Sequence, residues 1–410
     1  MKPSLNLQII ISAGIGIAAG TWLNLHGQGF GATPAILYWC DILGGIFINL
    51  LKMILIPLIF TSITVGIANL RAHAKMKQVW VTTLIFFLST MALSVILALI
   101  VVNVFKPGVG LQVALFKESM ANFKTQDLTL AQFLKSFISE MFKNPVSAMA
   151  NTEVLPTVVF AIFFGIGLVA LGEKSRNIFN FLNEVFEVIM TLVNWIMRLA
   201  PLGIMALLLK LVATQKLELF VNLGKFVTVV IGTTLFHGII VLPLILWIFT
   251  RISPLTFFKA MRESFLTAFS TSSSSATMPV TLRCVENNLN VDKGIAGFVI
   301  PLGTTVNMDG TAIYEATAAI FVANLVGIHL NLVQQLVVFF TSIIAAMGAP
   351  GIPSAGMVTM IMVLQSVGLP VEAIAILIPI DRPLDTIRTV VNVEGDAVGS
   401  CIVQKLTSRR

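Results

Sequence analysis

Long apolar runs are the feature that most constrains how this chain can fold. A helix needs about 20 consecutive apolar residues to cross the hydrocarbon core of a bilayer, which is about 30 Å thick. A β-barrel would instead show short segments of alternating polarity. The runs therefore predict an all-α polytopic membrane protein. They lie near residues 7–25, 43–69, 79–105, 153–171, 178–213 and 220–250.

The charge content agrees with a membrane protein. Only 11% of the 410 residues are charged and 57% are hydrophobic, whereas soluble domains carry about 25% charged residues. The net charge of +7 does not indicate nucleic acid, because the basic residues cluster in short connections between the runs. By the positive-inside rule, their alternation predicts that both termini are cytoplasmic. The first run follows Lys2 directly and has no clear cleavage site, so we expect it to stay as a helix.

The three cysteines, Cys40, Cys284 and Cys401, are widely spaced. Their spacing indicates neither a disulfide framework nor a structural metal site.

The pattern changes after residue 250. Two segments, about 254–289 and 331–368, have apolar arms too short to cross a bilayer singly, and tips of small residues. Backbone that leaves a helix within a membrane survives only inside protein or beside a cavity, so we expect re-entrant helical hairpins. A span with polar residues follows each hairpin, at 293–326 and 372–405. Such an internal repeat is typical of the central site of a transporter.

The last span carries a polar stripe. Asp381, Asp385, Arg388, Asn392 and Asp396 fall within roughly 80° of one another on a helix, at about 100° per residue. Charged groups in hydrocarbon cost on the order of 2.5–3.5 kcal/mol each even on mild scales, so they face one another, an ion, a ligand or water. The stripe therefore predicts a binding site for something charged.

The residue types within the stripe indicate roles. Arg388 offers a fork of donors that suits a carboxylate, and Asp385 suits an ammonium group, so an acidic amino acid fits both. Asp396 lies about 12 Å along the helix from Arg388, so it suits a cation and not the same ligand. Asp381 could position Arg388. Glu394 falls at about 220° on the same wheel, so we expect it to face away.

Other segments supply further polar groups. Six consecutive hydroxyl residues, Ser270 to Ser275, lie between apolar arms, which favours a binding surface over a flexible linker. Asn307, Asp309 and Gly310 predict a helix break whose carbonyls, with Asp309, suit Na⁺. Alternatively, Asp309 could pair with Arg388. The second tip, 348–356, is rich in Gly and Pro and fits either a gate or a structural kink.

Glu315 lies one turn after Thr311 in an apolar stretch. Burial disfavours the charged form of a carboxylate, so Glu315 could load and release a proton. A permanently protonated, hydrogen-bonded glutamic acid fits the sequence equally well.

Together these motifs resemble the dicarboxylate/amino acid:cation symporters, a family that includes archaeal aspartate transporters and animal excitatory amino acid transporters. The resemblance covers essentially the whole chain, and four motifs in the same order make it specific. The motifs are the tip ending Ala276-Thr277-Met278-Pro279, the break Asn307-Met308-Asp309-Gly310-Thr311, the tip Gly351-Ile352-Pro353, and the series Asp385, Arg388-Thr389, Asn392 and Gly395-Asp396.

The resemblance implies a homotrimer in a lipid bilayer, with eight transmembrane helices and two re-entrant hairpins per subunit and inverted repeats. Residues 1–77 and 111–216 would form a scaffold of spans 1, 2, 4 and 5. Residues 78–110 and 217–410 would form a transport domain of spans 3, 6, 7 and 8 with both hairpins, which slides as an elevator. The resemblance implies a carrier and not an enzyme, with no organic cofactor.

The functional positions of the family fall on residues of every motif. The implied substrate residues are Ser274, Thr311, Ile352 through its backbone, Asp385, Arg388, Thr389 and Asn392. One implied sodium site consists of Gly303, Asn307, Asn392 and Asp396. A second, made of carbonyls and formed only when the second hairpin closes, consists of Thr305, Ala346, Met347 and Ala349. A third consists of Asn307, Asp309 and Thr90.

The chain departs from the family in two places. Phe87 and Met91 lack the hydroxyls that the family places beside Thr90 in the third sodium site. Ser272 and Thr386 occupy the two positions at which the family carries a further arginine, so the role of that arginine is not carried over.

The predicted function is secondary active symport of L-glutamate or L-aspartate with Na⁺. Cotransport of H⁺ through Glu315 is a further hypothesis. The predicted location is the cell membrane, as in a prokaryotic inner membrane. Arg388 is similar to the acidic-substrate members, and Asp396 to the sodium-coupled branch. Glu315 matches the proton-carrying glutamate of the animal transporters.

Four alternatives remain. A proton-coupled dicarboxylate carrier or a neutral amino acid carrier would belong to the same family. An ion channel also uses polar stripes and hairpins, but usually repeats its filter around a symmetric pore, so the single asymmetric site favours a carrier. A hydrolase would need a base beside the serines, and the four histidines lie far from them in sequence.

Overall fold

The structure is a computed structural model that describes residues 5–27, 30–68, 77–110, 139, 141–151, 153–214, 217–351 and 353–407. Every regular element within these ranges is a helix, which confirms the all-α prediction. The three cysteines are buried and unpaired with one another.

Long helices occupy the predicted apolar runs of the first half of the chain. They are α1 (Leu5–His26), α2 (Thr33–Ala68), α3 (Lys77–Phe105), α7 (Val154–Leu171) and α8 (Arg176–Thr214), with short α6 at Pro145–Ala150 and the turn η4 at Gly172–Ser175. Among the described residues, four stretches are long and apolar enough to cross a membrane: Thr33–Ala68, Gln78–Phe105, Pro156–Ile196 and Val221–Thr250.

Helix α2 begins at Thr33 and not near residue 43 as predicted. Pro34 lies in its first turn, where a missing N–H costs nothing. Tyr38 and Trp39 on this extension are exposed, so the apolar run marks only part of the helix.

A π-helical turn interrupts the next long helix. Helix α9 (Leu217–Phe236) continues through η5 (His237–Val241) into α10 (Leu242–Thr250). π-Turns inside α-helices are frequent at functional sites. The turn places His237 and Gly238 in the buried interior.

The first hairpin consists of α11 (Pro254–Thr271) and α12 (Ser274–Asn288), which pack along each other. The chain reverses at Ser272, which has a left-handed conformation with φ of 50°. The side chain of Ser273 caps α12 by accepting a hydrogen bond from the N–H of Ala276. The break therefore lies in the predicted serine-rich tip.

The following span breaks where the sequence predicts. Helix α13 (Lys293–Val306) ends and α14 (Asp309–Leu325) begins across Asn307 and Met308. The second hairpin consists of α15 (Leu332–Gly348) and α16 (Ala355–Ser366), with its break in the predicted Gly/Pro tip. After the short turn η6 (Val371–Ala373), α17 (Ile374–Thr407) carries the polar stripe.

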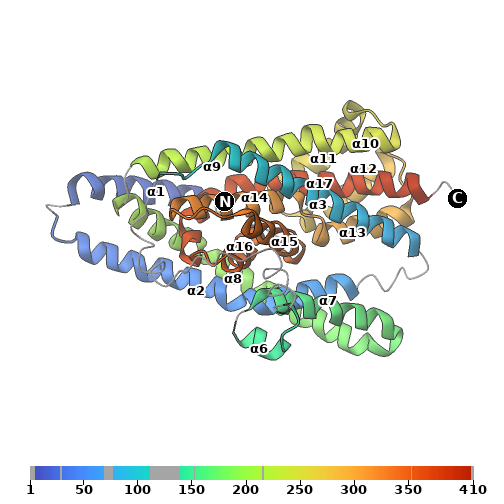
Figure 1. Cartoon of the computed structure of the whole chain (residues 1–410), viewed down its shortest axis with the longest axis horizontal. Helices are drawn as coiled ribbons and strands as arrows, with labels where there is room; N and C mark the ends of the chain where they lie inside the picture. The colour runs from blue at the N-terminus through green and yellow to red at the C-terminus, as the bar shows by residue number, and fades with distance from the viewer. Residues whose placement is uncertain are drawn as a thin grey trace.

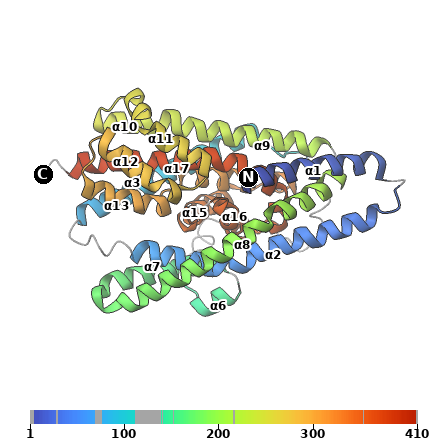
Figure 2. The ribbon, with the colours of Figure 1, turned by 180° about the vertical axis from the view of Figure 1, so that it is seen from behind.

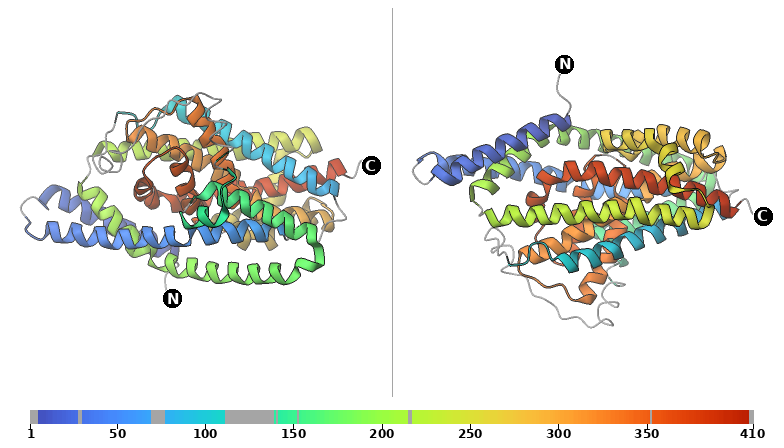
Figure 3. Two further views of the ribbon diagram at one scale, coloured as in Figure 1. Left: turned by 60° about the horizontal axis from the view of Figure 1, so that its bottom comes forward. Right: turned by 90° about the horizontal axis from the view of Figure 1, so that it is seen from above.

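The helices form two groups by packing. Helix α8 runs beside α1 and α2, and α7 packs on α2 (Figure 2). Helix α3 packs against α14, α15 and α17. Figure 1 shows α9 and α10 along one side, α2 and α7 along the opposite side, and α14 to α17 between them. The long helices run along the length of the molecule in both views of Figure 3.

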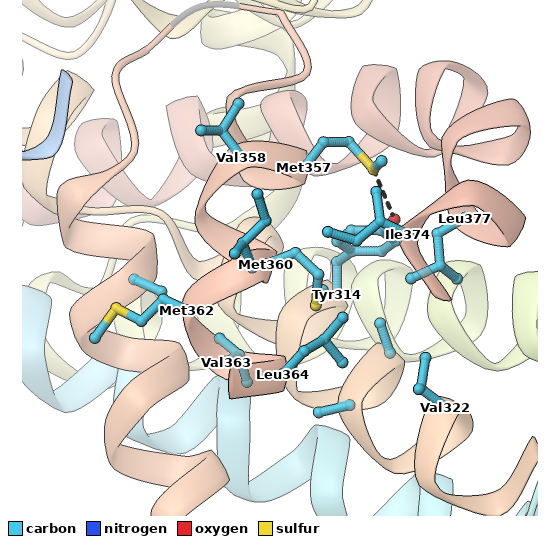
Figure 4. Packing of buried hydrophobic residues seen from close by; sticks show 14 of the residues in the cluster. Tyr314, Val322, Met357, Val358, Met360, Met362, Val363, Leu364, Ile374 and Leu377 are labelled. Atoms are coloured by element: carbon cyan, nitrogen blue, oxygen red, sulfur yellow. Dashed lines mark hydrogen bonds between the residues drawn. The ribbon is translucent and has the colours of Figure 1, made fainter. Parts of the chain in front are cut away.

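Apolar side chains of α14, α16 and α17 pack together beside the polar stripe. Figure 4 shows Met360 and Leu364 of α16 with Tyr314 of α14 and Leu377 of α17. The hydroxyl of Tyr314 donates a hydrogen bond to the sulfur of Met357 at 3.3 Å. This packing fixes the second arm of the second hairpin against the helices that carry the charged residues.

Candidate functional site

The five residues of the stripe lie buried on one helix. Asp381, Asp385, Arg388, Asn392 and Asp396 are each at most 6% exposed. The stripe therefore faces protein and not lipid, as the cost of charge in hydrocarbon requires.

Arg388 lies at the centre of the stripe and is fully buried. Its Nη2 donates to Asp381 at 2.5 Å and to Asp385 at 3.0 Å, which agrees with the predicted positioning role of Asp381. Its guanidinium carbon lies 4.0 Å above the ring of Tyr314, a favourable cation–π contact. Nη1 and Nε have no hydrogen-bond partner among the described residues. Two buried donors are thus left to bind a ligand.

Asp385 links α17 to the second hairpin. Its Oδ1 accepts from Arg388, and its Oδ2 accepts from the backbone N–H of Ser354 at 2.8 Å. On the same hairpin, a Cβ at Gly356 would lie 3.5 Å from Nη1 of Arg388 and 3.0 Å from the methyl group of Thr311. The tip therefore closes directly over the arginine.

The other predicted substrate residues converge on the same place. Asn392 accepts from the N–H of Gly310 at 2.8 Å and donates to the hydroxyl of Thr311 at 3.3 Å. Thr389 is buried. Ile352 lies outside the described residues.

The two hairpin tips meet beside these residues. The hydroxyl of Ser273 and the N–H of Ser275 both donate to the carbonyl of Gly351, at 2.6 and 3.0 Å. Ser274 is buried between them. The structure thus brings the serine-rich tip to the second tip, as a shared binding surface requires.

The first predicted sodium group forms a compact cluster at the helix break. Asn307 donates to Oδ1 of Asp396 at 3.0 Å, and Oδ2 of Asp396 is buried without a partner among the described residues. A Cβ at Gly303 would overlap this carboxylate, so only glycine allows the approach. The orphaned oxygen points to a cation.

The second predicted group lies where the second hairpin meets α13. Thr305 and Met347 line a small cavity together with Ser62 of α2. The N–H of Ala349 donates to the carbonyl of Ala346 at 3.2 Å, and both residues are buried.

In the third predicted group, Asp309 contacts a histidine. Oδ2 of Asp309 lies 2.9 Å from Nε2 of His237, and both side chains are fully buried. The alternative pairing of Asp309 with Arg388 is therefore wrong, because Arg388 pairs with Asp381 and Asp385.

The rest of that third group is partly apolar. Thr90 donates to Asn307 at 3.4 Å. Phe87 and Met91 are fully buried beside it and supply no oxygen from their side chains. Oδ1 of Asp309 has no partner within the described residues.

Glu315 is buried on α14, one helical turn after Thr311. Its Oε1 accepts from the hydroxyl of Thr359 at 2.5 Å, and its Oε2 is buried without a partner in the described part of the chain. Glu394, which we expected to face away from the stripe, is also buried, and its carboxylate lies close to Gly238 of the π-turn.

Several residues near the site were not predicted, among them Tyr314, Thr359, His237 and Arg382. His237 lies inside an apolar run whose only notable signal is the histidine itself. Arg382 of α17 is 7% exposed and lies 3.7 Å from Asp385. Within the described residues no group of three or more His, Cys, Asp and Glu side chains could hold a metal ion. The implied cation sites therefore depend on carbonyl, amide and single carboxylate oxygens.

A broken span, paired hairpins and a buried charged stripe define a helical membrane carrier. The pattern of the sodium:dicarboxylate symporter family matches residues 5–406, and the chain belongs to this family.

Similar proteins include excitatory amino acid transporter 3 of Homo sapiens, 33% identical over 98% of this chain and 85% of that protein. Excitatory amino acid transporter 2 of Mus musculus is 35% identical over 89% of this chain and 73% of that protein. Neutral amino acid transporter A of Homo sapiens is 32% identical over 96% and 81%.

Proposed function

We propose that this chain takes up L-glutamate or L-aspartate into the cell together with Na⁺. The single observation that carries the proposal is the buried guanidinium of Arg388, with two donors that no described protein group satisfies. A side-chain carboxylate matches those donors in charge and geometry. The relatives include both excitatory and neutral amino acid transporters, so the arginine decides the charge of the substrate.

The remaining predicted substrate residues suit the rest of an amino acid. Asp385 would bind the ammonium group, while Asn392, Thr389 and the serine-rich tip would bind the backbone carboxylate. Na⁺ is a second substrate. It would bind at Asn307 and Asp396, at the carbonyls of Thr305, Ala346, Met347 and Ala349, and, more weakly for lack of hydroxyls, at Asp309.

Coupling would follow from closure of the second hairpin. The second sodium site, made of backbone carbonyls, would form only when the tip of the second hairpin is closed. The closed tip would also cover the substrate. Each ligand would then raise the affinity for the other, and a half-loaded carrier would not move.

The proposal includes the architecture. Each subunit would have eight spans and two re-entrant hairpins, and three subunits would form a trimer in a prokaryotic inner membrane. Helices α1, α2, α7 and α8 would be the scaffold, and α3 with α9 to α17 the sliding domain. Packing supports this division, because each group makes most of its contacts internally.

Uptake into proteoliposomes tests the function. An inward Na⁺ gradient is expected to drive accumulation of radiolabelled L-aspartate above its external concentration. No accumulation is expected when the Na⁺ concentration is the same inside and outside. Accumulation of L-alanine and not L-aspartate would indicate a neutral carrier. Current without uptake would indicate a channel.

A further inference from the structure

A second arginine is buried on α17 without a predicted role. Arg382 lies one helical turn before Asp385 and is 7% exposed. A buried guanidinium is retained only where other groups compensate the loss of water. Its partners therefore indicate what it does.

Arg382 contacts the tip of the second hairpin. Its Nη1 lies 3.5 Å from the hydroxyl of Ser354 and 3.7 Å from Oδ2 of Asp385. The same Oδ2 accepts the backbone N–H of Ser354 at 2.8 Å. Arg382, Asp385 and Ser354 thus form a closed ring of polar contacts between α17 and the tip.

The tip needs such support because Ser354 is strained. It has φ of 60° and ψ of 20°, and as the first residue before α16 it makes no side-chain cap. A residue other than glycine persists in this conformation only where its surroundings hold it. The contacts that hold it come from α17.

Apolar and acidic groups both surround Arg382. A small cavity beside it is lined by apolar residues of α1, α2 and α8, and also by Asp381 and Ser354. The guanidinium therefore lies where α17 and the tip of the second hairpin supply its polar neighbours, and it contacts Ser354 and Asp385 there.

We propose that Arg382 is a positioning residue that holds the second hairpin closed by bridging Ser354 and Asp385. Arg382 lies one turn before Thr386 on α17, and Ser272 and Thr386 carry no charge at the two positions where the family has a further arginine. Ser272 has no partner for its hydroxyl within the described residues, and the Thr386 hydroxyl bonds within its own helix to Pro383. This inference rests on the proposed function, since it treats the second tip as the gate.

Cysteine accessibility at the tip tests the proposal. Half-buried Pro353 is changed to Cys after Cys40, Cys284 and Cys401 are replaced by Ser, and maleimide labelling is timed. Arg382→Gln is expected to label at least tenfold faster. The matched control is Arg283→Gln, because Arg283 is an exposed arginine paired with Glu263, and it is expected to label at the unsubstituted rate.

Relocation of the arginine separates gating from general stability. Thr386→Arg in the Arg382→Gln background is expected to restore slow labelling to within about threefold, an effect that a merely structural residue would not show. Ser354→Ala removes the hydroxyl that Arg382 contacts and leaves the arginine in place. It is also expected to make labelling faster. Equal labelling of Arg382→Gln and the unsubstituted protein would overturn the proposal.

The labelling needs no transport. Absence of L-aspartate binding to the unsubstituted protein would therefore refute the proposed function alone, while unchanged labelling would refute the role of Arg382 alone.

Discussion

At the scale of single residues, the burial of Arg388 decides the chemistry of the site. Removal of a guanidinium from water costs several kcal/mol. Asp381 and Asp385 compensate this cost only through Nη2. The proposed function therefore makes Arg388 the residue that would distinguish acidic from neutral amino acids.

Loss of this guanidinium is expected to remove acidic substrate binding. Arg388→Ala should weaken L-aspartate affinity by about 30-fold or more, because truncation of one partner of a buried charge pair costs about 2–5 kcal/mol. Calorimetry on purified protein measures it. Exposed Arg283→Ala serves as the control and is expected to stay within about twofold. Unchanged aspartate affinity in Arg388→Ala would refute the substrate assignment.

We propose that Glu315 carries a cotransported proton. Uptake should fall as the pH rises, because fewer carriers then hold the proton that net transport requires. Glu315→Gln imitates the protonated form, so it should remove the pH dependence while exchange continues. Glu394→Gln is the comparison, because Glu394 is the other buried glutamate among the described residues. Loss of the pH dependence in Glu394→Gln alone would contradict the assignment.

The stripe could be predicted from sequence because one helix carries all of it. Helical periodicity and the cost of buried charge suffice for residues on a single face. His237 could not be predicted, since its partner Asp309 lies 72 positions away and only packing joins them. Arg382 lies about 100° from Asp381 on the wheel, outside the stripe, and only the fold of the second tip brings Ser354 to it.

At the scale of elements, the break between α13 and α14 brings Asn307 beside Asp396, two residues of the first predicted sodium group. The sequence predicted the break from paired polar residues and a glycine. It did not predict how closely α13 and α17 approach. That closeness depends on Gly303, where any side chain would meet the carboxylate of Asp396.

The closeness of Gly303 to Asp396 predicts how the apparent affinity for Na⁺ depends on this glycine. Gly303→Ala should displace Asp396 and raise the Na⁺ concentration for half-maximal uptake by about tenfold, equivalent to about 1.4 kcal/mol. Gly297→Ala on the same helix meets nothing within 4 Å and is the matched control, with an expected effect below about twofold. A Na⁺ titration of uptake measures both, and equal half-maximal concentrations would show that Gly303 is not part of a cation site.

At the scale of the whole molecule, the elevator proposal requires the two groups of helices to slide past each other. Helices α2 and α13 lie on opposite sides of that boundary. A Cβ at Gly66 of α2 would lie 4.0 Å from the Cβ of Thr305 of α13, which is within the range for a disulfide.

A cross-link at this boundary should stop transport. Gly66→Cys with Thr305→Cys, in protein whose three native cysteines are Ser, is expected to lose at least nine-tenths of its uptake on oxidation and to regain it with reductant. The reduced form of the same protein is the control. Full uptake by protein shown by mass to be cross-linked would exclude sliding at this boundary.

The most direct test of the coupled site is equilibrium binding of radiolabelled L-aspartate to purified protein as Na⁺ is raised in choline-balanced buffer. Reciprocal coupling predicts that aspartate affinity rises with Na⁺, with a slope of log affinity against log Na⁺ concentration above one when more than one ion binds with the amino acid. Aspartate affinity that does not change with Na⁺ would contradict a site shared by the amino acid and its cations.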